Sequence, residues 1–176
     1  MTVMPILIHP DPRLKKVCDP VGDPKSVEAL VANMLDTMYD APGIGLAAPQ
    51  VGVNARLLVM DCTAKDEDPD PMVLLNPEVL ASSEATNVHE EGCLSIPDQF
   101  ADVTRPAEVT VRWTGPEGDA YERVFDGLWA TCVQHEIDHL NGVLFIDHIG
   151  AVRRQLITQK MKKLKRERAK SAAAGA

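Results

Sequence analysis

The sequence predicts an α+β domain in which mostly antiparallel strands surround a central helix. Two observations indicate this class: apolar residues alternate in several short segments, and they recur with helical spacing in three longer ones. The 176 residues suffice for one domain with a substantial core, and 45% hydrophobic and 25% charged residues are ordinary for a globular protein. No internal repeat is present, so we expect one unit over residues 1–170.

The elements follow from local patterns in chain order. Residues 1–24 contain five prolines and should form an arm with a helical turn near 13–17. Asp23-Pro24 is a start signal for an amphipathic helix that ends at Pro42-Gly43. The strands are expected at 56–60, 72–80, 87–94, 108–113 and 120–125, the last two forming a hairpin across 115–118. Helices at 127–141 and about 151–168 complete the domain, and residues 171–176 should fray.

The helix at 127–141 carries the motif H-E-x-x-H at His135, Glu136 and His139. Two histidines four residues apart project from one helical face, where they can bind one metal ion together. Glu136 occupies the position of the general base in metallohydrolases with this motif. The alternative is a helix that matches by coincidence, and Asp126 as N-cap with Gly142 as a C-terminal stop at least support the helix itself.

A catalytic site of this type takes three protein ligands and leaves one position open for water. Phe145 stands where metzincins carry their third histidine, and His148 lies three residues too far along. Cys132 lies about 7.5 Å along the helix axis from the midpoint of the two histidines, which a thiolate cannot easily bridge, so we expect it in the core. Cys93 is the best remaining upstream ligand.

The net charge of −8 conceals an asymmetry. Residues 153–176 carry nine Lys and Arg with one acidic residue, whereas residues 1–152 carry nine basic and 25 acidic residues. A basic tail on an acidic body predicts contact with a polyanion such as RNA. The equal alternative is a solvated helix end whose basic residues complement the helix dipole.

The cysteines and the apolar runs indicate a reducing compartment. The four cysteines are widely spaced, and no C-x-x-C pair is present. Residues 3–8 are too short for a signal peptide, and no apolar run approaches the roughly 18 residues of a membrane span. We therefore expect free thiols, a cytoplasmic location and no membrane contact.

Two upstream segments are informative when they are considered together with the H-E-x-x-H helix. Gly43–Gln50 reads GIGLAAPQ, which on its own favours a tight helix-to-strand connection, and Glu91–Ser95 reads EGCLS. These segments and Gln134–His139 resemble, in order and spacing, the three signature motifs of the peptide deformylase family. The resemblance covers essentially the whole chain and includes the terminal helix of the bacterial type.

The resemblance implies a metal ion bound by Cys93, His135 and His139, with water or hydroxide in the fourth position. Members of the family usually use Fe(II), while Ni(II) or Co(II) support activity and Zn(II) generally supports less. A thiolate with two imidazoles suits all four ions, so the residues themselves do not choose among them.

The implied reaction is hydrolysis of the N-formyl group from formylmethionine at the start of a nascent polypeptide, giving formate and a free amino terminus. Glu136 would take the proton of the metal-bound water and pass it to the leaving amine. The oxyanion would be held by the metal, the Gln50 side-chain amide and the Leu94 backbone N–H.

The resemblance also implies a substrate groove with an apolar pocket for the methionine side chain. The residues expected there are Ile44, Gly45, Glu91, Gly92, Leu128, Thr131 and Cys132. Thr131, Phe100 and His89 depart from the residues usual in relatives, which bears on affinity and side-chain preference. Glu91 and Arg105 should form a supporting ion pair, the alternative being two unrelated surface charges.

By the same resemblance, the basic helix at about 151–168 should dock at the ribosomal exit region. We also expect the protein to be a monomer with no DNA partner. Three other functions stay open from the residues. A peptidase for ordinary peptide bonds requires a third ligand other than Cys93. A ribosome-associated binding module with a structural metal requires a fourth protein ligand, and none is evident. A diverged hydrolase would act on another N-acyl group.

Overall fold

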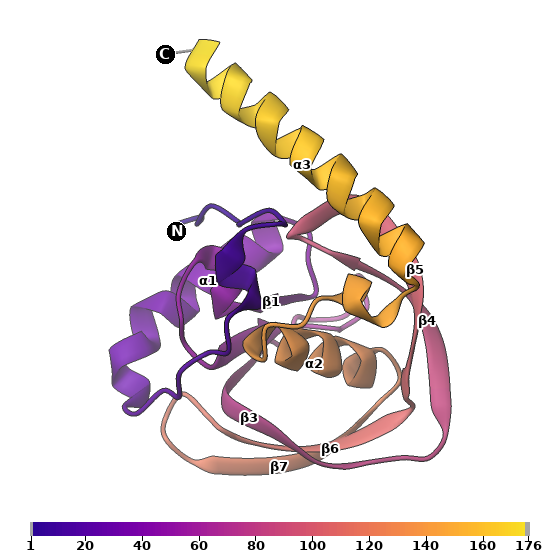
Figure 1. Ribbon diagram of the computed structural model, residues 1–176. Helices are drawn as coiled ribbons and strands as arrows, with labels where there is room; N and C mark the ends of the chain where they lie inside the picture. The colour runs from indigo at the N-terminus through magenta and orange to yellow at the C-terminus, as the bar shows by residue number, and fades with distance from the viewer. Residues whose placement is uncertain (1, 175–176) are drawn as a thin grey trace.

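The computed structural model describes residues 2–174, in which curved strands surround one central helix (Figure 1). The central helix α2 spans Gly127–Leu140, α1 spans Glu28–Asp40, and α3 spans Ala151–Ala174. Within this range, 3-10 helices η1 to η4 lie at Pro12–Lys15, Pro24–Val27, Ala48–Val51 and Phe145–His148. The predicted α+β class is confirmed.

The strands of the described residues form two antiparallel sheets. The larger sheet has the order β1-β2-β3-β6-β7, and its strands are Gly45–Ala47, Leu57–Met60, Met72–Ser82, Glu108–Thr114 and Ala120–Asp126. The smaller sheet pairs β4 (Thr86–Cys93) with β5 (Ile96–Pro106). The predicted hairpin is confirmed as β6 and β7, which pair from Glu108 opposite Asp126 to Thr114 opposite Ala120.

Several features differ from the sequence prediction. Strand β5 was not expected, because the side that it buries carries small Ala101 and charged Arg105 besides Ile96 and Val103. The glycine-rich segment contains the short strand β1 as well as η3. The first long helix begins as a 3-10 helix through Val27 before it continues as α1.

Helix α3 begins where expected but continues to Ala174, beyond the predicted end at residue 168. Residues 171–174, where fraying was expected, read Ser-Ala-Ala-Ala, and alanine is the strongest helix former. The same expectation for residues 175–176 lies outside the described residues. Figure 1 shows that the last turns of α3 extend beyond the body.

The apolar core consists of clusters on different sides of α2. One cluster lies between α2 and the larger sheet and includes Val111, Phe125 and Val133. A second joins β5 and η4 to the first turns of α3, where Ile157 and Met161 are buried. Val152 and Leu156, two further apolar residues of that helix, are instead 75% and 54% exposed. The body therefore covers only one narrow side of α3.

A third cluster packs α1 against β1 and β2. Within the described range, no helix is both long and apolar enough to cross a membrane. Helix α2 contacts the larger sheet and also strand β5 of the smaller sheet, so side chains from both sheets can meet beside it.

Candidate active site

The histidines and the glutamate of the central helix face the interior. His135, Glu136 and His139 are 8%, 4% and 1% exposed. The helix begins after Asp126, which has the extended backbone of an N-cap although its side chain makes no cap hydrogen bond. It ends before Gly142, whose φ of +71° is the left-handed conformation that glycine adopts most readily. The local start and stop signals thus place the motif on two buried turns.

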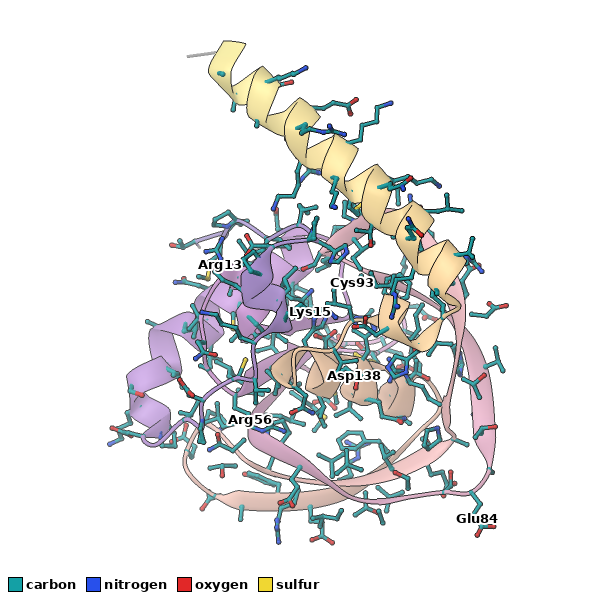
Figure 2. All side chains as sticks on the ribbon, in the orientation of Figure 1. Arg13, Lys15, Arg56, Glu84, Cys93 and Asp138 are labelled. Carbon is teal, nitrogen blue, oxygen red and sulfur yellow. The ribbon has the colours of Figure 1, made fainter. Side chains whose placement is uncertain are left out.

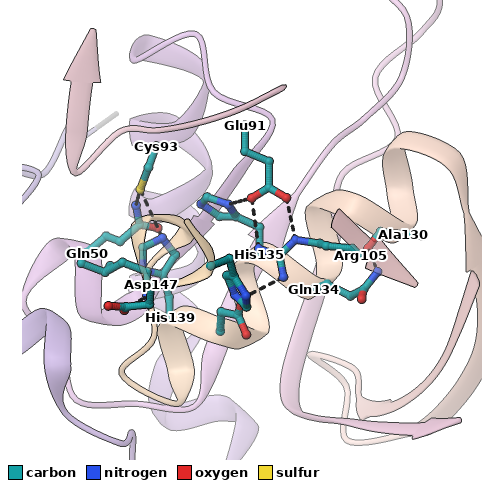
Figure 3. A network of polar contacts seen from close by, with 12 residues as sticks. Gln50, Glu91, Cys93, Arg105, Ala130, Gln134, His135, His139 and Asp147 are labelled. Atoms are coloured by element: carbon teal, nitrogen blue, oxygen red, sulfur yellow. Dashed lines mark hydrogen bonds and ion pairs between the residues drawn. The ribbon is translucent and has the colours of Figure 1, made fainter. Parts of the chain in front are cut away.

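The three expected metal ligands lie together. Their candidate ligand atoms are all within 4.8 Å of one another, and Cys93 Sγ is 3.3 Å from His139 Nε2 (Figure 3). Cys93 ends strand β4, where the pairing register with β5 shifts between Glu91 and Cys93, and such irregularities re-aim side chains. Figure 2 shows Cys93 near the middle of the molecule and Glu84 at its outer edge.

This donor set fits a divalent transition metal. One thiolate and two imidazoles suit Fe(II), Co(II), Ni(II) or Zn(II), and three protein ligands leave a position for water. Burial lowers the pKa of His139 well below its usual value, which keeps the imidazole neutral as a ligand requires. Cys132, the alternative thiol, is buried in the core cluster, as expected.

Glu91 orients the first histidine. Its Oε2 lies 2.8 Å from His135 Nδ1, so Nδ1–H donates to the carboxylate and Nε2 is left for a metal. Arg105 Nε and Nη2 donate to the two Glu91 oxygens at 2.6 and 3.0 Å, which confirms the expected ion pair (Figure 3). Burial alone would raise the Glu91 pKa, but the hydrogen bonds from His135 and Arg105 lower it to about 2.

Glu136 has an unpartnered buried oxygen. Its Oε2 has no hydrogen-bond partner among the described residues, and burial raises its pKa to about 7. A buried carboxylate oxygen normally finds a partner, so a water or substrate group is expected there. Strand β1 approaches closely: a Cβ on Gly45 would lie 2.5 Å from Glu136 Oε1 and 2.9 Å from Cys132 Sγ. Any larger residue at this position would force Glu136, Cys132 or the strand to shift.

Gln50 is fixed by its own turn. Its Oε1 accepts from the Ala47 backbone N–H at 2.8 Å, and its Nε2 donates to Ser95 Oγ at 3.3 Å and Cys93 Sγ at 3.5 Å. Helix η3 begins at Ala48 and has Pro49 in its first turn. It places Gln50 at this position, where the residue is 1% exposed. The orientation aims the NH₂ group, rather than the oxygen, at the ligand cluster.

A cavity of about 610 Å³ opens beside these groups. All residues expected to bind substrate line it, namely Ile44, Gly45, Glu91, Gly92, Leu128, Thr131 and Cys132, and so do Gln50 and Leu94. The Thr131 hydroxyl donates to the Gly127 carbonyl at 3.3 Å, so it is not left unpaired in the pocket.

Sequence reasoning missed part of the cavity wall. The first residues of β5 contribute Ile96 to Gln99, and the segment after α1 contributes Ala41 to Gly43. Phe100 covers Gly92, since a Cβ there would lie 2.6 Å from the Phe100 ring. A break in hydrophobic alternation at Pro97-Asp98 was the sequence signal at this part of the wall.

A thiolate and two imidazoles beside a buried carboxylate and an open cavity define a metal-dependent hydrolase of the H-E-x-x-H class. A family model described as Polypeptide deformylase matches residues 3–155. The chain belongs to this family.

Individual relatives agree over nearly the full length. A peptide deformylase of Mesorhizobium japonicum is 52% identical over 96% of this chain and 97% of its own. Among solved structures, a peptide deformylase from Legionella pneumophila has a TM-score of 0.87 at 42% identity, covering 96% and 98% of the two chains. One from Ehrlichia chaffeensis in complex with actinonin has a TM-score of 0.90 at 36% identity, covering 94% and 99%.

Proposed function

We propose that this protein hydrolyses the N-formyl group from formylmethionine at the amino terminus of nascent polypeptides and releases formate. The observation that carries the proposal is the meeting, at one cavity, of three ligand side chains, an unpartnered Glu136 oxygen and a Gln50 amide. Gln50, Cys93 and the pair of histidines with Glu136 come from the three separate segments that carry the family resemblance. Family membership supports the choice of substrate.

Cys93, His135 and His139 would hold one divalent ion, and we propose Fe(II), with Ni(II), Co(II) or Zn(II) as substitutes. Such an ion polarises a carbonyl oxygen and lowers the pKa of water. The burial of both histidines, the half-buried position of Cys93 and the hydrogen bond between Glu91 and His135 Nδ1 support this ligand set.

Glu136 is the proposed general acid and base. Its carboxylate would accept a proton from the attacking water and deliver it to the amine that leaves with the peptide. A pKa near 7 suits both transfers at neutral pH, because the carboxyl group is then able to bind and release a proton. The unpartnered Oε2 is the atom available for this exchange.

Gln50 and Leu94 are the proposed oxyanion donors. The Ala47 N–H holds the Gln50 oxygen and leaves its Nε2 directed toward Cys93, next to the expected position of the formyl carbon. With the Leu94 backbone N–H, this amide would stabilise negative charge that develops on the formyl oxygen. Because both donors are held by the fold, they need no reorganisation during the reaction.

The substrate backbone would lie as an added strand along β1, which is the outer strand of the larger sheet. Ile44 and Gly45 line the cavity on this side, and Gly92 lines it from β4. The methionine side chain would enter between Leu128, Thr131 and Cys132. Ile44 and Leu128, exposed by 42% and 46%, are free to cover it.

We also propose that α3 docks the protein at the ribosomal exit region, where the substrate emerges. Its distal half carries exposed basic side chains suited to ribosomal RNA, including Lys162, Lys163, Arg166, Arg168 and Lys170. Ile157 and Met161 anchor the first half of α3 in the core, so the helix is part of the same unit as the body. The proposed catalytic domain spans residues 1–170. A monomer in the cytoplasm fits this role.

The decisive measurement is formate release from formyl-Met-Ala-Ser by anaerobically prepared, Fe(II)-loaded protein, beside the Cys93→Ala variant. We expect rapid release by the wild type and none by the variant. Equal release by both would indicate that Cys93 is not a ligand and that the metal site lies elsewhere. No release by a metal-loaded wild type would favour a different acyl substrate, and cleavage of unformylated peptides would favour a peptidase.

A further inference from the structure

His148 is joined to the ligand His135 by an unbroken series of polar contacts. His148 Nε2 lies 2.7 Å from Asp138 Oδ2, and the same oxygen accepts from Arg105 Nη1 at 2.9 Å. The other side of the Arg105 guanidinium holds Glu91, whose Oε2 accepts from His135 Nδ1. His148 lies three residues beyond the position of a third histidine ligand, but its contacts lead to the proposed ligand His135.

Burial raises the free-energy cost of any unpaired polar group in the inner part of this series. Glu91 and Arg105 are 5% and 6% exposed, so a guanidinium N–H without a partner would carry the full cost of desolvation. Asp138 provides the partner for Nη1, which leaves Nε and Nη2 aligned on the Glu91 carboxylate. The position of Asp138 thus decides the geometry of the pair that orients His135.

Asp138 itself is less constrained. Its side chain is 22% exposed, and without His148 the carboxylate could turn toward water. The 2.7 Å contact from His148 holds Oδ2 where it can also serve Arg105. Figure 2 places Asp138 on α2, and His148 ends η4, so the contact ties these two elements together.

Helix η4 meets His135 by a second route. The Phe145 ring stacks on the His135 ring, with centroids 6.2 Å apart and planes inclined by 21°. The Leu144 backbone N–H donates to Asp147 Oδ2 at 2.8 Å and fixes the first turn of η4. Phe145 therefore restrains the ring directly, and His148 restrains it through the polar series.

We propose that His148 is a positioning residue that keeps His135 in its metal-binding orientation through Asp138, Arg105 and Glu91. The inference rests on the proposed role of His135 as a ligand. Loss of His148 frees Asp138, loosens the hold of Arg105 on Glu91, and lets the His135 ring deviate from its ligating position. The metal ion then dissociates faster, although His148 touches neither metal nor substrate.

The test compares His148→Ala, His148→Gln and the matched control Arg112→Ala. Arg112 makes an exposed ion pair with Glu78 at 2.9 Å, far from the series. Each protein is loaded with Co(II), and metal loss to a chelator is followed by the thiolate–Co(II) absorption. We expect about tenfold faster loss from His148→Ala, the low end of the range for groups behind metal ligands. The Gln amide can donate to Asp138, so His148→Gln should restore slow loss.

A double-mutant cycle tests the route. In a Glu91→Gln background, His148→Ala should add almost nothing, because the path to His135 is already broken. Equal effects in both backgrounds would overturn the proposal, as would unchanged metal loss from His148→Ala or equal acceleration in Arg112→Ala. Failure here is distinct from failure of the proposed reaction, which formate release by the wild type decides alone.

Discussion

Replacing Gly45 by alanine tests whether the close approach of β1 to Glu136 sets the catalytic rate. The added Cβ would lie 2.5 Å from Glu136 Oε1, whereas ordinary contact begins at 3.4 Å, so one of the two groups must move by about 0.9 Å. A misplacement of about 1 Å in a catalytic group can lower the rate about 10²-fold. We therefore expect kcat for formyl-Met-Ala-Ser to fall about a hundredfold.

The kinetic constants separate two effects of this substitution. Displacement of the general base lowers kcat, whereas obstruction of the substrate backbone raises KM. Overpacking should also destabilise the domain by about 1–3 kcal/mol. The metal content should be unchanged, because the new methyl group meets Glu136 and Cys132 but no proposed ligand.

Gly22→Ala is the matched control, since a Cβ at Gly22 has no heavy atom within 4 Å and should change nothing. Formate release is measured with metal-saturated proteins, and thermal unfolding is recorded alongside. A Gly45→Ala variant with a kcat within twofold of the wild type would refute the reasoning. It would mean that Glu136 can move without consequence and that its position is not catalytic.

Four further substitutions or deletions test separate parts of the proposal. Glu136→Ala should retain metal in elemental analysis but lose nearly all formate release; wild-type rates would remove its role. Gln50→Ala should lower kcat by 10²–10³, about 2.7–4 kcal/mol, if its amide is an oxyanion donor. Glu91→Ala should weaken metal binding about 10- to 100-fold in chelator competition. Deletion after Leu164 should spare tripeptide hydrolysis, because the buried Ile157 and Met161 remain, while co-sedimentation with ribosomes weakens; full ribosome binding would place docking elsewhere.

Sequence reasoning succeeded where the determining interactions are local. The central helix, its cap positions and the spacing of His135 and His139 depend on residues within a few turns, so the 3.6-residue period was sufficient. The hairpin of β6 and β7 likewise follows from alternation around a short turn. Cys93 was also selected from the sequence as the candidate third ligand, because helix geometry eliminated Cys132, and Cys93 does lie beside the two histidines.

Only the tertiary structure could decide the contacts between distant segments. Strand β5 was invisible because Arg105 lies on its buried side, and that burial is acceptable only when Glu91 and Asp138 surround the guanidinium. The partner of the Gln50 amide, the cavity wall at the start of β5 and the contact of His148 with Asp138 also depend on segments that are distant in the sequence. A local sequence pattern indicates which side of an element is buried. Which charged groups meet on that side depends on how distant segments pack together.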